Sequence, residues 1–353
     1  MSNDKNTVPP TLQDVAEALG MHKSTVSYAL SGKGTLSVGT RNRILSAARD
    51  MGYVPNPIAQ RLASGHRNPA VFIFSGVLDV GLATEKILLI QRELTGEGFE
   101  VPIYTCYESA DTERRTQAAQ IRQICRQGPR AIICAGQMLD HSVFEELREY
   151  QSTGGHVVSY DSAVPLTCDQ VIFDREHNAY IAAKYLLERG HRNIGLGLPS
   201  NIEWISKNYM QPERPKGFLR AVVECGATVN DEWIFHHSTY ERGGEELAKR
   251  FMEMKGRPTG LCIVNDYVAL AFMVTVMRHG IRIPEDLSVI GHDNQTIADY
   301  CPVPLTSATQ PAEEIAHAVV KMLLDRLNGN DEPARSVTIA GRVIERQSVS
   351  GLE

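Results

Sequence analysis

The stretch TLQDVAEALGMHKSTVSYALSG, residues 11–32, decides the fold of the N-terminal part of the chain. Its apolar residues recur at helical spacing, and Gly20 in its middle is a typical helix stop. Thr11 suits an N-cap, and Asp14 adds an acidic group to the first turn. We therefore expect one short helix up to Gly20 and a second one that begins at residue 22 or 23.

The second of these helices has a polar outer side. Its inner face is Val26, Ala29 and Leu30, and its outer face is Lys23, Ser24, Ser27 and Tyr28. Two short helices joined around a glycine match the helix-turn-helix motif, whose second helix enters the major groove of DNA. Base edges offer hydrogen-bond donors and acceptors, so short polar groups and a cation suit that position. A small helical bundle with a solvated face is the alternative interpretation.

A very short helix is expected in the next stretch, GYVPNPIAQRLASGHR. Its start and stop signals are Asn56, Pro57 and Gly65. A helix over residues 57–64 is too short to be stable alone in water. Ile58 and Leu62, one turn apart, form its only apolar stripe. We expect it to fold when two copies meet on DNA.

Composition and charge indicate an intracellular protein. The chain has 353 residues, 42% hydrophobic and 22% charged, which suits two or three globular domains. The seven cysteines are scattered, as is typical of reduced thiols. No signal peptide or membrane span is apparent, so we expect a soluble, cytoplasmic protein. Residues 1–67 hold eight Lys or Arg and four Asp or Glu, so they carry +4 and the rest carries −10. A basic head suits contact with a polyanion, although the imbalance is small.

The body, from Ala70 onward, alternates short apolar strands with amphipathic helices. This alternation predicts parallel sheets with crossover helices, and the length favours two lobes. Ligands of such folds bind beyond the carboxyl ends of the strands. Four predicted strands end in polar residues, which favours a polar cleft there: Ser75, Asp161, Asn265 and Asp293. Each could instead serve a turn or cap, as Asp266 could cap the helix that starts there.

The head resembles the headpiece of the lactose-repressor family of bacterial transcription regulators. The matching segments are residues 11–32, TRNRILSAARDMGYVPN and AQRLASG, and the similarity continues to VIERQS near the C-terminus. It implies that residues 57–64 are a hinge helix in the minor groove, where Leu62 kinks the duplex. Packing of Leu62 within a monomer is the alternative. The expected DNA contacts come from Thr11, Lys23, Ser24, Thr25, Ser27, Tyr28, Asn56, Ala59 and Leu62. Tyr28 replaces an arginine that reads guanine in many members.

The body resembles the two-lobed periplasmic sugar-binding fold that this family carries as its effector domain. The expected fold is thus a small all-α head and an α/β core of two Rossmann-like lobes. The resemblance places Arg214 of ERPKGF, Asn265 of VNDYVAL and Asp293 of GHDN at effector-binding positions, together with Asp161 and Ser75. Carboxylates accept from hydroxyl groups and a guanidinium donates to them. A sugar or sugar derivative is therefore the expected effector.

Two departures from the family pattern leave the effector's identity open. The stretch SGVLDVGLATEK stands where the family often has Asn-Pro-Phe-Phe. Ser238 stands where a ligand-stacking aromatic is common. Tyr240 or Trp204 is a possible substitute, and surface packing is the alternative role of Trp204.

The expected organisation has three parts. Residues 1–56 form the DNA-binding head, residues 57–68 the hinge helix and linker, and residues 69–353 the effector-binding and dimerisation core. The chain should cross between the lobes near residues 161–164, 307–311 and 330–336. The expected lobes are 69–162 with 310–332, and 163–309 with 333–353. A homodimer is expected because paired heads need paired half-sites, and no heptad tail for tetramers follows.

Enzymes and transport proteins are the rival classes. GLGLPS is not a dinucleotide fingerprint, and no phosphate loop or nucleophile elbow occurs. The pair His236–His237 lacks a partner at metal-ligand spacing, so no metal, cofactor or catalytic residue is expected. A transport binding protein would need a signal peptide and would have no helix-turn-helix. The sequence therefore predicts a sequence-specific DNA-binding regulator, a repressor, whose operator affinity is controlled allosterically by a small polar effector.

Overall fold

The computed structural model describes residues 10–31, 36–53, 68–76, 82–105, 116–136, 139–199, 213–238 and 240–352. The chain divides into two compact units, Met1–Asn68 and Pro69–Glu353. The predicted DNA-contacting residues Asn56, Ala59 and Leu62, together with Trp204 and the side chain of Tyr240, lie outside the described residues. In the part of the chain that is described, no helix is long and apolar enough to cross a membrane.

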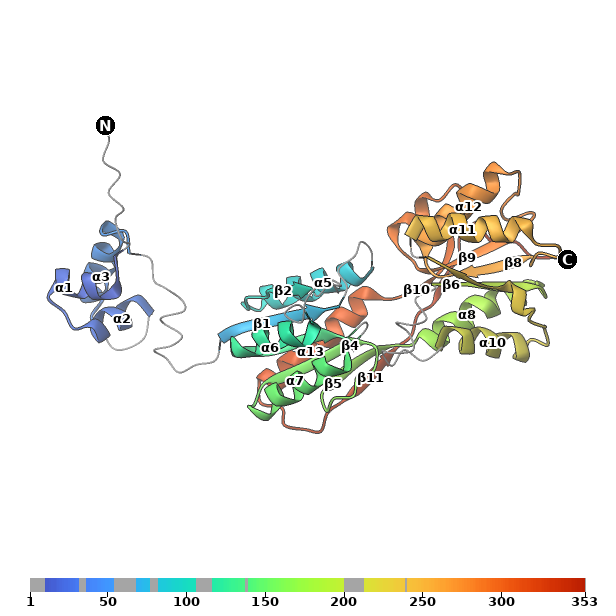
Figure 1. Cartoon of the computed structure of the whole chain (residues 1–353). Helices are drawn as coiled ribbons and strands as arrows, with labels where there is room; N and C mark the ends of the chain where they lie inside the picture. The colour runs from blue at the N-terminus through green and yellow to red at the C-terminus, as the bar shows by residue number, and fades with distance from the viewer. Residues whose placement is uncertain are drawn as a thin grey trace, which may run out of the picture. The chain divides into compact units, whose positions relative to one another are not determined.

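Among the described residues, the first unit contains three short helices, α1 (Leu12–Leu19), α2 (Lys23–Ser31) and α3 (Val38–Asp50) (Figure 1). Their shared core consists of Val15, Ala16, Val26, Ala29, Ile44 and Ala48. Thr11 and Asp14 form a reciprocal capping box at the start of α1, and Gly20 ends this helix in the left-handed conformation, with φ 61°. The predicted cap and stop of α1 are thus confirmed.

The N-lobe of the second unit is a six-stranded sheet in the order β11-β5-β4-β3-β1-β2. Its strands are β1 (Asn68–Ser75), β2 (Ile103–Thr105), β3 (Pro129–Ala135), β4 (His156–Asp161), β5 (Asp169–Phe173) and β11 (Ser336–Ile339). Its helices are α5 (Leu82–Gly96), α6 (Gln117–Arg126), α7 (His141–Ser152) and α13 (Ala312–Leu327). Apolar residues of α5 and α13 cover one face of the sheet, and those of α6 and α7 cover the other.

The C-lobe repeats this plan with the strand order β12-β10-β9-β8-β6-β7. Its strands are β6 (Ile194–Pro199), β7 (Ile234–His237), β8 (Gly260–Ile263), β9 (Ser288–Asp293), β10 (Thr306–Thr309) and β12 (Val343–Ile344). Its helices are α8 (Arg175–Glu188), α10 (Glu213–Glu224), α11 (Tyr240–Glu253) and α12 (Asp266–Arg278), with the 3-10 turns η2 (Asp231–Trp233) and η3 (Thr296–Tyr300). Helices α8 and α10 cover one face, and α11 and α12 cover the other. Because the paired strands are parallel except for β12, the predicted two parallel-sheet lobes are confirmed.

Two of the predicted crossings between the lobes are placed too early. Strands β5 and β11 pair with each other in parallel and belong to the N-lobe sheet. The chain therefore leaves the N-lobe at residue 174 instead of 161–164, and its last crossing follows Ile339 instead of lying at 330–336. The physical reason is that β5 pairs directly with β4 after a tight connection, so both edge segments extend the first sheet. The middle crossing, near 307–311, agrees with the end of β10 and the start of α13.

An ion-pair network around the buried Asp169 links β11 to β5 and α13. The Asp169 carboxylate at the start of β5 accepts hydrogen bonds from the guanidinium groups of Arg326 on α13 and Arg335 just before β11. The backbone N–H of Arg335 also donates to it, at 2.8 Å. These bonds lower the pKa of Asp169 to about 2, against the opposing effect of burial. A charge buried in this way is stable only while its partners remain in place.

We predict that Asp169→Asn lowers the free energy of unfolding of the core by about 3 kcal/mol, because it leaves two guanidinium groups without their shared anion. The stability that Asp169 contributes is fully present above its unfolded-state pKa and is lost as the pH falls from about 4 towards 2. Urea unfolding at several pH values measures both effects. The control Asp325→Asn removes only a partly exposed ion pair with Arg335 and should cost less than about 1 kcal/mol. Equal losses in the two variants would contradict this account.

Candidate functional site

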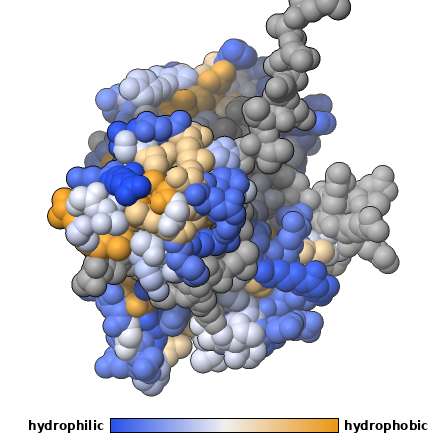
Figure 2. Space-filling view, turned by 90° about the vertical axis from the view of Figure 1, so that its left-hand side faces the viewer, coloured by the Kyte–Doolittle hydropathy of each residue, from blue (hydrophilic) through white to orange (hydrophobic). Residues whose placement is uncertain are grey.

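The outer side of α2 carries the residues predicted to contact DNA. Lys23, Ser24 and Tyr28 are exposed, while Val26 and Ala29 are buried in the head's core. Thr25 and Ser27, on the same helix, are half-buried. Thr11 caps α1 as described above. Figure 2 shows hydrophilic residues over most of the face that it presents, with smaller apolar areas between them.

In the core unit, the predicted effector-binding residues lie at the carboxyl ends of strands. Ser75 ends β1 and Asp161 ends β4 in the N-lobe. In the C-lobe, Asp293 ends β9, and Asn265 is the second residue after the end of β8. Asp161 and Asp293 both have positive φ angles, 78° and 96°. Non-glycine residues rarely adopt this region, and its cost of about 1–3 kcal/mol is typical of functional sites. We call these four residues, with Arg214, the strand-end site.

Asp161 joins the two lobes through partners that the sequence analysis missed. Its carboxylate accepts hydrogen bonds from the buried ammonium of Lys86 on α5 and from Gln310 Nε2, at 2.9 Å, in the middle crossing. Arg175, the first residue of α8, donates to the Asp161 carbonyl at 2.8 Å and to Ser162 Oγ at 3.1 Å. Lys86, Asp161 and Arg175 are all buried. The oxygen atoms of Asp161 are therefore taken up largely by protein donors.

The charged groups around Asp161 shift each other's pKa values. Burial raises the pKa of Asp161, but the cations Lys86 and Arg175 overcome it and hold the pKa below its ordinary value. Burial lowers the pKa of Lys86 despite the attraction of Asp161. No motif signals Lys86 in advance, because a lysine four residues into an amphipathic helix usually lies in solvent. Only the tertiary fold reveals its role.

Arg214 is brought to the strand-end site by close packing of α10 against α8. Gly217, one turn later, lies so near α8 that a Cβ atom there would be 1.9 Å from the carbonyl oxygen of Glu176. The half-buried side chain of Arg214 lies near Asp293, Arg175 and Glu213, and the partial loss of solvent lowers its pKa to about 10. Its one hydrogen bond within the described residues is a long one, 3.5 Å from Nη1 to Asn178 Oδ1. The guanidinium therefore keeps donors for a further partner.

Asn265 and Asp266 have different roles. The Oδ1 atom of Asn265 is buried and has no hydrogen-bond partner among the described residues. Asp266 is fully buried, accepts from the Gln295 backbone at 2.7 Å and from Ser307 Oγ at 2.8 Å, and so links α12 to β10. Burial and nearby Asp293 raise its pKa. Asp266 is thus part of the scaffold, whereas Asn265 offers an open acceptor.

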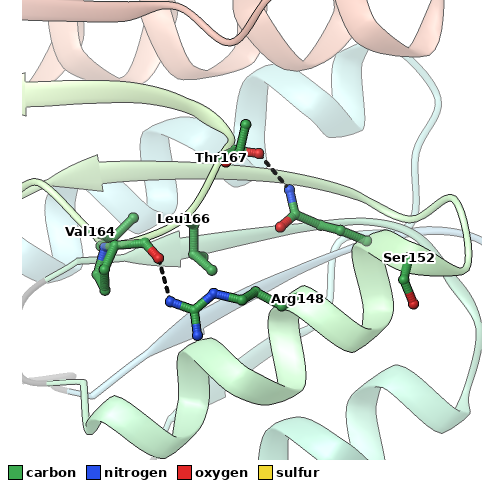
Figure 3. A pocket seen from close by; sticks show the side chains of 7 residues that line it. Arg148, Ser152, Val164, Leu166 and Thr167 are labelled. Carbon is green, nitrogen blue, oxygen red and sulfur yellow. Dashed lines mark hydrogen bonds between the residues drawn. The ribbon is translucent and has the colours of Figure 1, made fainter.

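A separate hollow of about 590 Å³ lies on the N-lobe between α7 and the connection from β4 to β5. Arg148 reaches from α7 to the carbonyl of Pro165, and Gln151 reaches to that of Thr167 (Figure 3). These side chains are already bonded to the backbone that they face. None of the predicted effector-binding residues lines this hollow.

Comparisons with known proteins agree with these observations. Residues 11–56 match the model of bacterial regulatory proteins of the lacI family, and residues 183–349 match the periplasmic binding protein-like domain. The chain is 27% identical over 340 residues to the HTH-type transcriptional repressor PurR of Proteus mirabilis (strain HI4320), covering 96% of this chain and 97% of that protein. PurR of Klebsiella pneumoniae (strain 342) is 26% identical, with the same coverage.

Two solved structures share the fold. The lac repressor dimer bound to operator and the anti-inducer ONPF has a TM-score of 0.82 and 20% identity, covering 98% of this chain and 100% of that one. The transcriptional regulator CelR in complex with cellobiose has a TM-score of 0.69 and 21% identity, covering 96% of this chain and 99% of that one.

A helix-turn-helix head followed by a two-lobed binding core defines a DNA-binding transcription regulator with an effector-binding domain. The chain belongs to the lacI family of bacterial transcription regulators, which confirms the expected family. This is a family of regulators and not of enzymes, so the rival enzymatic interpretation is excluded.

We predict strong energetic coupling between Lys86 and Asp161. Lys86→Met leaves a buried carboxylate and Asp161→Asn leaves a buried ammonium, so each should lower the free energy of unfolding by about 3 kcal/mol. The double variant removes both charges and should lose at least about 1 kcal/mol less than the sum of the single losses. Chemical denaturation of the three variants and the parent measures the cycle. Additive losses would show that the two residues do not act as a pair.

Proposed function

We propose that this regulator is a repressor that binds a roughly palindromic operator as a homodimer in the cytoplasm. Support comes from the relatives named as repressors and from the lac repressor dimer, whose fold the chain shares over 98% of its length. Two heads related by a two-fold axis would read two half-sites. Lys23 and Ser24 at the front of α2 are exposed, which supports their assignment to base edges, and Thr25 and Ser27 would contact phosphates.

We further propose that the central step of DNA binding is the ordering of residues 57–64. This helix would form when two copies meet on the duplex and Leu62 enters the minor groove beside Ala59. The proposal comes from the sequence, since these residues lie outside the described part of the chain. Binding of the head alone to one half-site would remain possible but weak.

We also propose that the strand-end site binds the effector, on the evidence of its hydrogen-bonding groups. Within the described residues, Arg214 makes a single long hydrogen bond and the buried Asn265 Oδ1 has no partner, and Asp293 lies near Arg214 with a positive φ angle. A sugar or sugar derivative is the leading ligand, because hydroxyl groups both donate and accept. Relatives with the same fold were solved with cellobiose and with ribose. Since Arg175 and Gln310 tie both lobes to Asp161, a ligand bound here would change DNA affinity by favouring one arrangement of the lobes.

We predict that Leu62→Ala weakens operator binding by about tenfold or more, because the apolar wedge that compensates unstacking is lost. Mobility shifts on an operator selected from random DNA measure affinity, and circular permutation of that fragment measures bending. Leu219→Ala, on the exposed side of α10, is the matched control and should bind like the parent. If Leu62→Ala binds and bends the operator as the parent does, the proposed hinge is wrong.

We also predict that Arg214→Ala and Asp293→Ala separate the two activities. Both variants should bind the selected operator within about twofold of the parent, because neither residue belongs to the head. Both should lose any change in operator affinity that a stabilising sugar causes in the parent, because the guanidinium and the carboxylate are proposed to hold it. Titration of operator with and without that sugar gives the answer. A full response in both variants would exclude this site.

A further inference from the structure

His292 is a buried group near Arg214 that the proposed function does not use. It precedes Asp293 at the end of β9, where the family pattern Gly-Phe-Asp-Asp becomes GHDN. Its side chain is fully buried. Alternation along a strand puts it on the same face as Ile290, which packs in the cluster of α8 and α10 with Phe218. Arg214 is one helical turn before Phe218, so His292 lies beneath the start of α10.

The hydrogen bonding of His292 defines its tautomer. Its Nδ1 lies 3.1 Å from the carbonyl oxygen of Ile263, an acceptor, so Nδ1 must carry the proton. The Nε2 atom is buried and has no partner among the described residues. Burial, with the Arg214 cation nearby, lowers the pKa of His292 to about 3. The ring is therefore neutral at cellular pH, and Nε2 is an open acceptor.

Most of the unpartnered polar groups near Arg214 are hydrogen-bond acceptors. His292 Nε2 and Asn265 Oδ1 are both buried acceptors without partners in the described part of the chain. Asp293 adds a carboxylate that accepts only, while Arg214 contributes N–H donors that make a single long hydrogen bond within the described residues. A buried acceptor left unpaired costs about 1–3 kcal/mol, so a ligand that supplies donors recovers this cost. A phosphate group would instead bring acceptor oxygens against three acceptors.

We propose that His292 is a specificity-determining residue of the effector site, whose Nε2 atom accepts a hydrogen bond from an uncharged effector rich in O–H or N–H donors. This inference rests on the proposed function, since it deepens the assignment of the same site. It narrows the effector class to unphosphorylated sugars, polyols or N–H-bearing heterocycles. Phosphorylated sugars are disfavoured.

Thermal shifts of the full-length protein test the effector class. The panel pairs ribose with ribose 5-phosphate and glucose with glucose 6-phosphate, and adds cellobiose, inositol and hypoxanthine. A ligand that binds only the native state raises the melting temperature. At least one uncharged compound should do so, and a phosphorylated counterpart in the panel should do so less. The inference is overturned if only phosphorylated compounds stabilise the protein or if no uncharged compound does.

Variants test the role of His292 directly, by calorimetric titration with the uncharged compound that raises the melting temperature most. His292→Phe should bind it at least about tenfold more weakly, because the acceptor is lost. His292→Gln keeps an acceptor oxygen and should retain more affinity, and it serves if His292→Phe fails to fold. Ile290→Val, on the same face of β9, is the packing control and should bind like the parent. Parent-like affinity in His292→Phe, or equal losses in His292→Phe and Ile290→Val, would overturn the assignment.

A nitrogen NMR spectrum of the ring gives a readout that a packing role would not produce. The His292 signals, assigned by their loss in His292→Gln, should show a neutral ring with the proton on Nδ1 from pH 5 to 8. The Nε2 shift should move when the stabilising compound is added. A protonated ring or a proton on Nε2 would contradict the inference. Binding of the same preparation to the selected operator is measured in parallel, so a failure of this inference is distinguished from a failure of the proposed function.

Discussion

The structure of the core depends on how the buried carboxylate of Asp161 is satisfied. An isolated charge in this position would be very costly, so the fold must supply donors from around it. Lys86 from the first helix of the N-lobe and Gln310 from the crossing donate hydrogen bonds to the carboxylate. Arg175, from the first helix of the C-lobe, pairs with it at 3.8 Å and donates to the backbone carbonyl of Asp161. One anion thus fixes three segments that are distant in sequence, and it does so where the N-lobe sheet ends.

This arrangement divides the site into two parts with different roles. On the N-lobe side the charge of Asp161 is paired with Lys86 and Arg175, so these residues connect the two lobes. On the C-lobe side, Asp266 accepts hydrogen bonds from Gln295 and Ser307, while Asn265 Oδ1 has no partner and Arg214 makes one long bond in the part of the chain that the structure describes. The close approach of Asp266 to β9 needs a glycine, since a Cβ at Gly291 would lie 2.1 Å from its Oδ1 atom. The binding groups therefore stand on a rigid support next to a joint, as a ligand-controlled switch requires.

Much of this could be predicted from the sequence, and the failures have physical reasons. Periodicity and cap residues gave the head and the strand–helix alternation, because both are local properties. The order of predicted strands placed Asp161, Asn265 and Asp293 at the ends of strands, and parallel strands end on one side of a sheet. The lobe crossings were misplaced because β11 is short and largely exposed, so its pairing with β5 has no strong local signal. Lys86 and the tautomer of His292 depend on tertiary contacts, which no sequence pattern displays.

Hydrogen–deuterium exchange of the full-length protein tests most directly whether the strand ends form the ligand site. The panel compound that raises the melting temperature most should slow exchange in peptides covering residues 174–178, 292–295 and 309–311, where the bonded segments of the two lobes meet. The hollow lined by Arg148 and Thr167 should exchange as before. Protection confined to the hollow, with the strand ends unchanged, would contradict the account.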